Sequence, residues 1–531
     1  MKVYFHFALH NHTLICHEMA KHWNRKYGWV DFAGLMGLKG GNHYQYLLNQ
    51  PDIKYRYLDV IESIEKKALQ YEPSSTIVEE WERRIDSPLW HLVLADRNIG
   101  HHFVTGGVIP RTYIMEHASH SDIAKFVCFY LEYFERRLSE FKPDFVFFTV
   151  IAALPALALA KVCQWKNIPF YTLESIRIGN RYVIGANTVQ QRITRIEDRY
   201  REQCINMPSD LRIPEELSNY IESFKGDSPV EPIWAEPFRG RQSALRRQRL
   251  GRYWAENIVE FVKMCRRLLL AQSYKKNDLR HKKALSAWLC EIKRRRAIRR
   301  FDVKRYDRVE VGQEPYVLFP LHLDPEASTM VLAPNYVNQL NVIDCLAKNI
   351  PLTHKLYVKE HPTMVGRRPR GYYKQLRRYP NLRIISPSEN IYNLIKKSSL
   401  TAIITGTAGL EAMLMGKLVL TFGSNFFSHV GLSERCGNLD QIGKTIKRMI
   451  FNDNDGEQMM REKKLRLFLN LLYEESFTLP NMLWKPNLQE GPFNSEELEG
   501  VRSICSAIES LHGEVNEIGA VLKENAGELL Q

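Results

Sequence analysis

Short apolar runs alternate with helical segments between residues 316 and 422, and this alternation limits the fold more than any other feature of the chain. Apolar runs separated by helices are typical of parallel sheets, whose strands are buried on both faces. The pattern predicts a doubly wound α/β domain over residues 311–442. Strands are expected at 316–320, 355–358, 382–385, 401–405 and 418–422, with helices at 335–348, 372–378, 391–397 and 409–415.

A second α/β domain is expected at the N-terminus, over residues 1–192. Strands are predicted at 3–9, 145–149 and 169–173, and helices at 119–141 and 155–164. Two short apolar runs at 103–104 and 108–109 flank the turn Gly106-Gly107. Between the two domains, residues 193–310 read as a charged helical insertion, clearest at 253–270. Residues 443–531 read as a polar helical segment, so the chain is predicted to be α/β with four parts.

Positive charge is concentrated in one stretch. The chain carries a net charge of +14, but residues 239–308 alone hold 23 Lys and Arg against 6 Asp and Glu, a net +17. One interpretation is a solvated helical face. The other is contact with an anionic inner-membrane surface, where each Lys or Arg contributes about 1 kcal/mol. No RRM, helix-turn-helix or zinc pattern accompanies the charge, so nucleic acid is not an expected partner.

Cysteine usage and hydropathy bear on the compartment. The 9 cysteines are scattered without a CxxC spacing, which favours a reducing compartment and no metal site. The most apolar stretch, 145–160, is short and is interrupted by Pro155, so a transmembrane span is not expected. No secretory signal is apparent at the start of the sequence. We therefore expect a cytoplasmic protein, peripheral at the inner membrane if the basic stretch contacts lipid.

The first candidate ligand loop follows the strand at 355–358. It reads Lys359-Glu360-His361-Pro362, and the proline ends the strand. Ligands of open parallel sheets lie beyond the carboxyl ends of the strands, so Lys359, His361 and Pro362 are expected to face a nucleotide. Imidazole and ammonium groups both donate hydrogen bonds to phosphate oxygens. The alternative is a solvated surface loop.

The second candidate is a small-residue turn that follows the strand at 401–405. Thr405, Gly406 and Thr407 lead into a helix, and Glu411 comes one turn later. Small residues allow the backbone to approach a ligand closely, and amides at a helix start favour an anion. Glu411 is suited to accept hydrogen bonds from ribose hydroxyls. The alternative is close strand–helix packing with a threonine N-cap.

Further polar residues follow other strands. His322, Glu326 and Ser328 lie in the loop after 316–320 and are expected to face the same cleft; the alternative is a long connection capped by Ser328. In the N-terminal domain, Glu174 and Arg177 follow the strand at 169–173. Glu174 is a candidate nucleophile or general base, and the alternative is a Glu174–Arg177 ion pair that orders the loop.

A group of histidines lies close to the N-terminus. His10 and His12 stand with His17 in the first helical stretch, yet too few carboxylates or thiols accompany them for a metal site. An acceptor-side or structural role is predicted for them instead.

Taken together, these segments resemble bacterial capsule polysaccharide biosynthesis proteins, a group that includes the β-Kdo transferases. The resemblance covers residues 316–425 and, more loosely, 145–187. It implies a GT-B fold with two Rossmann-like domains facing a cleft. It rests on Pro320-Leu321-His322, Pro325-Glu326-Ala327-Ser328-Thr329, Val358-Lys359-Glu360-His361-Pro362, Thr405-Gly406-Thr407-Ala408-Gly409-Leu410-Glu411-Ala412, Gly416-Lys417-Leu418-Val419 and Phe422-Gly423.

The resemblance implies that His361, Thr405, Gly406 and Thr407 hold the nucleotide of an activated sugar, which is CMP-Kdo in the transferases. Those transferases carry a Glu-Asp-Gly motif with the Asp as nucleophile. This chain has Glu174-Ser175-Ile176 instead, which leaves the donor sugar and the mechanism open.

The function expected from the sequence is a glycosyltransferase that moves a sugar from a nucleotide donor to a glycan or glycolipid acceptor, with no tightly bound cofactor. Two alternatives remain. A sugar-nucleotide epimerase would use the same fold without an acceptor. A non-catalytic partner in a capsule-assembly complex would explain the missing Asp near Glu174.

Overall fold

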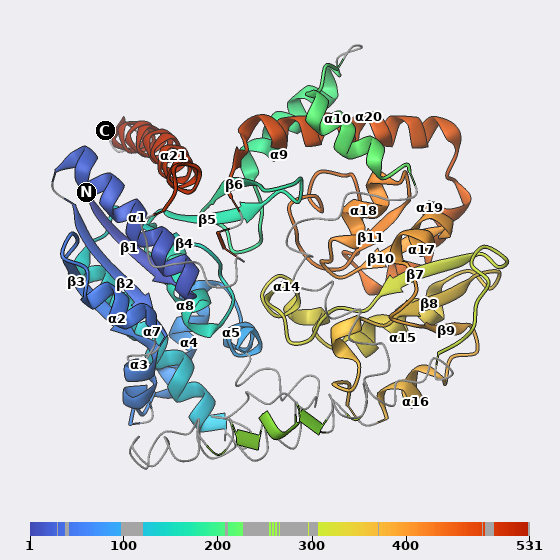
Figure 1. Cartoon of the computed structure of the whole chain (residues 1–531), viewed down its shortest axis with the longest axis horizontal. Helices are drawn as coiled ribbons and strands as arrows, with labels where there is room; N and C mark the ends of the chain where they lie inside the picture. The colour runs from blue at the N-terminus through green and yellow to red at the C-terminus, as the bar shows by residue number, and fades with distance from the viewer. Residues whose placement is uncertain are drawn as a thin grey trace. The chain divides into compact units, whose positions relative to one another are not determined.

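The computed structural model describes residues 1–28, 30–37, 42–68, 70–96, 120–207, 211–226, 306–369, 371–480, 482–483 and 493–528, together with single positions between 254 and 296. The chain divides into two compact units (Figure 1). Unit 1 comprises Met1–Leu92, His120–Arg199 and Leu469–Gln531, and unit 2 comprises Val93–Ser119 and Tyr200–Phe468. Each unit holds one mainly parallel sheet, as the α/β prediction requires.

The sheet of unit 1 has the strand order β13-β6-β5-β4-β1-β2-β3. The five strands from β5 to β3 are parallel, and β6 and β13 add antiparallel pairs at one edge. The predicted strands at 3–9, 145–149 and 169–173 are confirmed as β1, β4 and β5. The strands of this sheet are β1 (Lys2–Phe7), β2 (Asp31–Met36), β3 (Tyr55–Val60), β4 (Phe145–Phe148), β5 (Phe170–Ser175), β6 (Arg181–Ala186) and β13 (Phe477–Thr478).

Helices cover the unit 1 sheet, and the predicted helices at 119–141 and 155–164 are confirmed as α7 and α8. The predicted strands at 103–104 and 108–109 lie outside the described residues. The helices are α1 (His10–Tyr27), α2 (Asn42–Leu48), α3 (Ile61–Ala68), α4 (Ser75–Ile85), α5 (Leu89–Ala95), α7 (His120–Phe141), α8 (Leu154–Trp165), α9 (Thr194–Ile205) and α21 (Ser495–Glu528). The division between the units falls inside α5, α9 and α20 (Asp455–Glu475).

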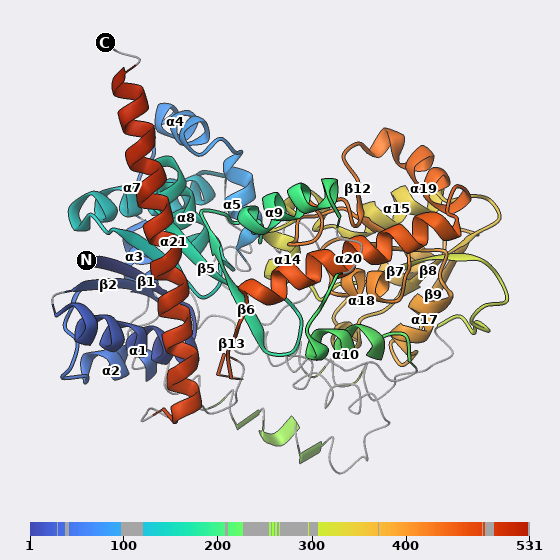
Figure 2. The same cartoon turned by 90° about the horizontal axis from the view of Figure 1, so that it is seen from above.

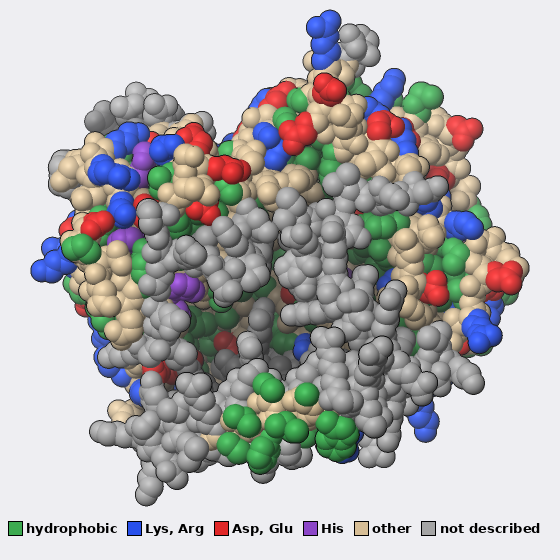
Figure 3. Space-filling model, in the orientation of Figure 1, with side chains coloured by type: hydrophobic (Ala, Val, Ile, Leu, Met, Phe, Trp, Pro, Cys, Tyr) green, Lys and Arg blue, Asp and Glu red, His purple; other side chains and the backbone are tan. Residues whose placement is uncertain are grey.

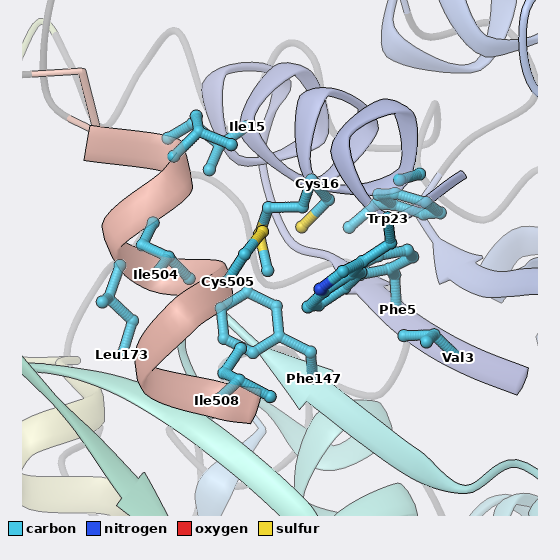
Figure 4. Packing of buried hydrophobic residues seen from close by; sticks show 14 of the residues in the cluster. Val3, Phe5, Ile15, Cys16, Trp23, Phe147, Leu173, Ile504, Cys505 and Ile508 are labelled. Carbon is cyan, nitrogen blue, oxygen red and sulfur yellow. The ribbon is translucent and has the colours of Figure 1, made fainter. Parts of the chain in front are cut away.

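The last helix of the chain, α21, completes the core of unit 1. It runs beside α1 in Figure 2, and its Ile504 and Ile508 are fully buried among residues of β1 and β4 (Figure 4). Trp23 of α1 donates its indole N–H to the Glu509 carboxylate at 2.9 Å. The described part of residues 443–531 is mainly helical, with the short strand β13. Its last helix, α21, belongs to the N-terminal unit, because its apolar side chains fill the space beside Phe5 and Phe147.

Unit 2 contains a parallel sheet with the order β12-β11-β10-β7-β8-β9. All five strands predicted between 316 and 422 are present. In β7, four successive residues are fully buried: Tyr316, Val317, Leu318 and Phe319. Both faces of the strand are covered, so its apolar residues follow one another without alternating polar residues. The strands are β7 (Tyr316–Pro320), β8 (Lys355–Lys359), β9 (Leu382–Ile385), β10 (Leu400–Ile403), β11 (Val419–Thr421) and β12 (Glu434–Arg435).

The helices of unit 2 match the predicted positions at 335–348, 372–378, 391–397 and 409–415. They are α10 (Glu215–Ser223), α14 (Ala327–Met330), α15 (Gln339–Asn349), α16 (Tyr372–Leu376), α17 (Ile391–Lys397), α18 (Ala408–Leu414), α19 (Ile442–Phe451) and α20, with short 3-10 turns η3 (Pro334–Tyr336), η4 (Pro362–Met364) and η5 (Leu439–Gln441). The predicted helix at 253–270 lies for the most part outside the described residues. None of the helices described here is both long and apolar enough to span a bilayer.

Each sheet reverses its winding at one place. In unit 2 the chain passes from β7 outward to β8 and β9, and then returns to place β10 on the other side of β7. In unit 1 the same reversal separates β1 from β4. Crevices at such reversals, beyond the carboxyl ends of the strands, are where open α/β sheets bind ligands.

Replacing Ile504 by Ala should lower the free energy of unfolding by about 2–4 kcal/mol, because it removes buried methylene groups from the unit 1 core. Urea titration followed by circular dichroism measures the change. Leu352→Ala, at a side chain that is 99% exposed, is the control and should have little effect. Equal midpoints for the two variants would contradict the assignment of α21 to this core.

Candidate functional site

Three predicted ligand loops meet at the winding reversal of unit 2. His322 follows β7, Gly406 follows β10, and His361 follows β8. The ring of His322 lies against Gly406, since a Cβ built on that glycine would be 3.1 Å from His322 Cε1. Arg368 donates both to the His322 carbonyl and to Glu360, the residue before His361, so the loop after β8 lies beside His322. The structure therefore brings together residues that are far apart in sequence.

His322 joins the loops after β7 and β10. Its Nε2 accepts the backbone N–H of Ile404 at 3.3 Å, so the neutral ring carries its proton on Nδ1. Burial is the largest cause that lowers its pKa to about 3, so it stays neutral at physiological pH. Gln339 holds the backbone of the same residue, accepting from His322 N and donating to His322 O. No sequence pattern indicated that Gln339 would hold this backbone.

The loop that carries His361 is supported by a buried ion pair. Glu360 is fully buried, and Arg368 donates to its carboxylate at 2.9 Å and to the His322 carbonyl at 3.1 Å. The Tyr373 hydroxyl also donates to Glu360, at 2.7 Å. Although burial alone would raise it, the pKa of Glu360 is lowered, chiefly by Arg368. The alternative of a solvated loop is wrong for Glu360, because three donors replace the water it loses.

His361 is held in one orientation by its own turn. Its Nδ1 accepts the N–H of Thr363 at 3.3 Å and lies 2.8 Å from the Thr363 hydroxyl oxygen. Pro362 occupies the first position of η4, where its missing N–H costs no hydrogen bond. With Nδ1 accepting, a neutral His361 carries its proton on Nε2.

Lys359 has a protein partner. Its ammonium donates to the Pro387 carbonyl at 3.3 Å, in the loop after β9, and the side chain is buried. Burial lowers its pKa to about 8. In this conformation Lys359 links the ends of β8 and β9, and its contact with a phosphate stays a prediction.

The small-residue turn after β10 is tied to the loop after β7. Thr405 donates its hydroxyl to the Ser328 carbonyl at 2.8 Å. Ser328 in turn donates to the Glu326 carboxylate at 2.7 Å, at the start of α14. These two hydrogen bonds connect Thr405, Ser328 and Glu326, three residues that the sequence predicts in the cleft.

Thr407 and Glu411 lie at the start and in the first turn of α18. Thr407 occupies the N-cap position, as the alternative reading predicts, but its side chain makes no capping hydrogen bond. Both side chains are half-buried rather than enclosed. Their roles toward a nucleotide stay predictions.

Sequence reasoning missed the loop that follows β11. Gly423 packs against Thr405, since a Cβ built there would lie 2.4 Å from Thr405 Cγ2. The Ser424 hydroxyl oxygen lies 2.7 Å from His429 Nε2. The backbone N–H of Ser424 donates to the Leu332 carbonyl. The only signal was the pair Phe422-Gly423, which the family resemblance included without a physical role. A side chain at Gly423 would clash with Thr405, so the loop after β11 packs against the same group of loops.

In unit 1, Glu174 lies on β5 above a glycine of the neighbouring strand. Gly185 pairs with Thr172, and a Cβ built on it would be 2.6 Å from Thr172 Oγ1 and 3.3 Å from Glu174 Cγ, so a side chain there would crowd both residues. Burial raises the pKa of Glu174 to about 7, and the neighbouring Thr172, Arg177 and Gln191 only partly offset this. A carboxyl group with such a pKa can donate or accept a proton at neutral pH.

Arg177 follows in a constrained backbone. Its φ of 66° lies in the left-handed region, which is uncommon for residues other than glycine. Its N–H donates to the Ser175 hydroxyl at 3.3 Å. The charge of Arg177 acts on Glu174 less strongly than burial does, so an ion pair does not dominate this carboxylate.

The predicted histidines lie at the winding reversal of unit 1. His12 is buried, and its Nδ1 is 2.7 Å from the Thr149 hydroxyl oxygen, directly after β4. Burial lowers its pKa to about 4, so it is neutral at physiological pH. His10 is half-buried against the ring of Tyr46. In the part of the chain that the structure describes, no three His, Cys, Asp or Glu side chains are placed to hold a metal ion.

Replacing Arg368 by Met should cost about 3–5 kcal/mol of stability, because it leaves a buried carboxylate without its cation. The double variant Glu360→Gln/Arg368→Met should recover much of that loss, since the buried charge is gone. Urea midpoints of the two variants and the wild type decide the matter. Additive losses would show that the two side chains do not act as a pair.

Glu174→Gln should gain stability relative to the wild type as pH rises. The folded-state pKa of about 7 lies above the ordinary value of 4.5, so the stability from the protonated carboxyl is present below pH 4.5 and is lost as pH rises through 7. The difference in unfolding free energy between the variant and the wild type should increase by about 1–3 kcal/mol from pH 5 to pH 8. Glu79→Gln, at an exposed position, should give parallel curves; parallel curves for Glu174→Gln would contradict the raised pKa.

Comparison with solved structures gives distant likenesses. UDP-GlcNAc 2-epimerase from Neisseria meningitidis, bound to UDP-GlcNAc, is 14% identical, with 88% of this chain and 94% of that chain covered and a TM-score of 0.26. KpsC from Thermosulfurimonas dismutans, a β-Kdo 2,7 transferase, is 14% identical, with 58% and 74% covered and a TM-score of 0.26. At these values the comparison does not decide between a transferase and an epimerase.

Sequence comparison is more specific. The capsule polysaccharide modification protein LipA of Neisseria meningitidis serogroup B (strain ATCC BAA-335 / MC58) is 26% identical over 98 residues, which span 18% of this chain and 14% of LipA. Residues 208–460 match the family described as capsule polysaccharide biosynthesis protein, and this range nearly coincides with the long segment of unit 2, Tyr200–Phe468. The matched residues, just under half of the chain, include the three converging loops.

Proposed function

We propose that this protein is a glycosyltransferase of capsule or surface polysaccharide synthesis, and that unit 2 binds the nucleotide of an activated sugar. The observation that carries the proposal is the convergence of the loops after β7, β8 and β10 at the winding reversal of the sheet. A loop with its backbone exposed at Gly406 and a histidine held in one orientation at His361 are suited to a phosphate group.

The interior of the site supports this reading. His322, Glu360 and Arg368 are buried and satisfied by protein partners, so they hold the loops in place. His361, Gly406 and Thr407 lie nearer the surface. We assign His361, Thr407 and the amide of Gly406 to the phosphates, and Glu411 to the ribose. Whether the donor is CMP-Kdo or another nucleotide sugar is left to a binding panel.

We assign acid–base chemistry to Glu174. In the proposed reaction, its carboxylate takes the proton of an acceptor hydroxyl. The hydroxyl oxygen attacks the anomeric carbon, and the bond to the nucleotide breaks with its electron pair on the phosphate oxygen. The pKa of about 7 supports the assignment, because a base with a pKa near the working pH is effective. Under this proposal, Glu174 supplies the carboxylate that an Asp supplies in the β-Kdo transferases that the chain resembles.

His361→Ala should weaken nucleotide binding about 10- to 100-fold, because it removes a donor to the phosphates. Isothermal titration calorimetry with CMP, UDP and GDP and their sugars measures the affinity. Lys374→Ala, at an exposed position of α16, is the control and should bind as the wild type does. No binding of any nucleotide to the wild type, or equal affinity in His361→Ala, would overturn the donor site.

Glu174→Gln should retain nucleotide affinity but lose transfer activity, with kcat lower by about 100-fold or more. Transfer is followed by release of free nucleotide in the presence of acceptor glycan. Release without acceptor, together with isomerised donor sugar, would instead identify an epimerase. Full activity in the variant would remove Glu174 from the mechanism, and a complete absence of turnover in the wild type would favour a non-catalytic partner.

A further inference from the structure

Helix α8 begins in the interior of unit 1 without a capping group. Its N-cap residue, Ala153, makes no side-chain hydrogen bond, and no acidic residue lies in the first turn. Leu157 donates the first hydrogen bond of the helix, to the Ala153 carbonyl. Pro155 has no N–H, and among the contacts of the described residues the N–H groups of Leu154 and Ala156 have no acceptor. Leu154 and Ala156 are each 1% exposed, so the helix start leaves two backbone donors largely shielded from water.

A histidine on the neighbouring strand lies next to the end of β4, from which the chain enters α8. His6 of β1 pairs with Phe148, the last residue of β4, and the two rings are 5.7 Å apart. Whereas other histidine side chains reach the surface of unit 1 in Figure 3, His6 is 7% exposed. Within the described structure its Nδ1 has no hydrogen-bond partner. A side-chain nitrogen near the start of α8 is thus buried and unsatisfied, like the two amides.

These groups together favour an oxyanion. Amides at the start of a helix and the helix dipole both attract negative charge. Burial lowers the pKa of His6 to about 4, so the ring is neutral at physiological pH, and a neutral imidazole donates one N–H to an oxygen. We propose that unit 1 binds an oxyanion at the amino end of α8, held by the amides of Leu154 and Ala156 and by His6. The ligand class is a phosphate group or a sugar carboxylate, which share this chemistry.

The oxyanion site is separate from the proposed nucleotide site of unit 2. It lies where the sheet of unit 1 reverses its winding, between β1 and β4. On the next strand, Thr172 pairs with Phe148, and Glu174, two residues later, faces the same side of the sheet. An oxyanion at the start of α8 is therefore on the side of the sheet that carries the proposed base.

The assignment of this oxyanion to the acceptor substrate rests on the proposed function, in which Glu174 takes the proton of the acceptor hydroxyl. The binding of the oxyanion does not rest on it. Oxyanion binding is measured without nucleotide, and nucleotide binding without the oxyanion, so failure of either proposal can be recognised without the other.

The test is titration of the full chain at neutral pH with inorganic phosphate, glucuronate and glucose, followed by NMR of the ligands. We expect phosphate or glucuronate to bind, and the tighter of the two identifies the source of the oxyanion. Glucose lacks the negative charge and should bind at least about tenfold more weakly than the tighter oxyanion. If neither phosphate nor glucuronate binds the wild type, or if glucose binds equally well, the proposal is overturned.

Ala153→Asp is the variant that blocks the site. The Ala153 backbone is extended, with φ −159° and ψ 170°, so an aspartate there can cap α8 and occupy its amides with a carboxylate. This variant should lower the affinity for the oxyanion at least about tenfold, while its urea midpoint equals or exceeds that of the wild type.

Ser75→Asp is the matched control. It adds the same charge at the exposed start of α4, also in unit 1, and should bind the oxyanion as the wild type does. His6→Phe keeps a ring against Phe148 but removes the ring nitrogens, so it should bind about three- to tenfold more weakly. Equal affinity in Ala153→Asp and Ser75→Asp would overturn the site at α8, and wild-type affinity in His6→Phe would overturn the role of His6.

Discussion

The candidate donor site depends on one buried ion pair. Glu360 and Arg368 lie in the loop after β8, yet Arg368 also donates to the carbonyl of His322 in the loop after β7. His322 then accepts from the backbone after β10. Charge and hydrogen bonding thus link three strand ends that have no covalent connection at this edge of the sheet. A buried pair of this kind adds little net stability, and its value lies in the single arrangement that it allows.

Much of unit 2 could be predicted from the sequence. Its strands are buried on both faces, so each appears as a short apolar run, and the turns between them contain Gly, Pro or Asn. The positions of His322, His361 and Gly406 at strand ends followed from that reading. The pairing of Glu360 with Arg368 did not, because neither residue differs in type from the charged residues of any solvated loop, and only the fold removes water from them.

Unit 1 was harder to predict for a different reason. The strands β2 and β3 contain Asp31, Arg56 and other polar residues, and β6 pairs antiparallel at the edge. Residues 443–531 were expected to form a polar helical segment, and that expectation does not state which surface α21 packs against. Periodicity specifies local structure, whereas the partner of an apolar face is decided by packing across the whole unit.

The contribution of α21 has a consequence for how the chain is made. Residues Met1–Leu92 and His120–Arg199 emerge from the ribosome long before Ile504 and Ile508, which fill their core. The long segment of unit 2, Tyr200–Phe468, is complete before then. Part of the apolar surface of the N-terminal sheet therefore stays uncovered until α21 has been made. The long segment of unit 2 can thus complete its core before unit 1 does, although most of unit 1 comes earlier in the sequence.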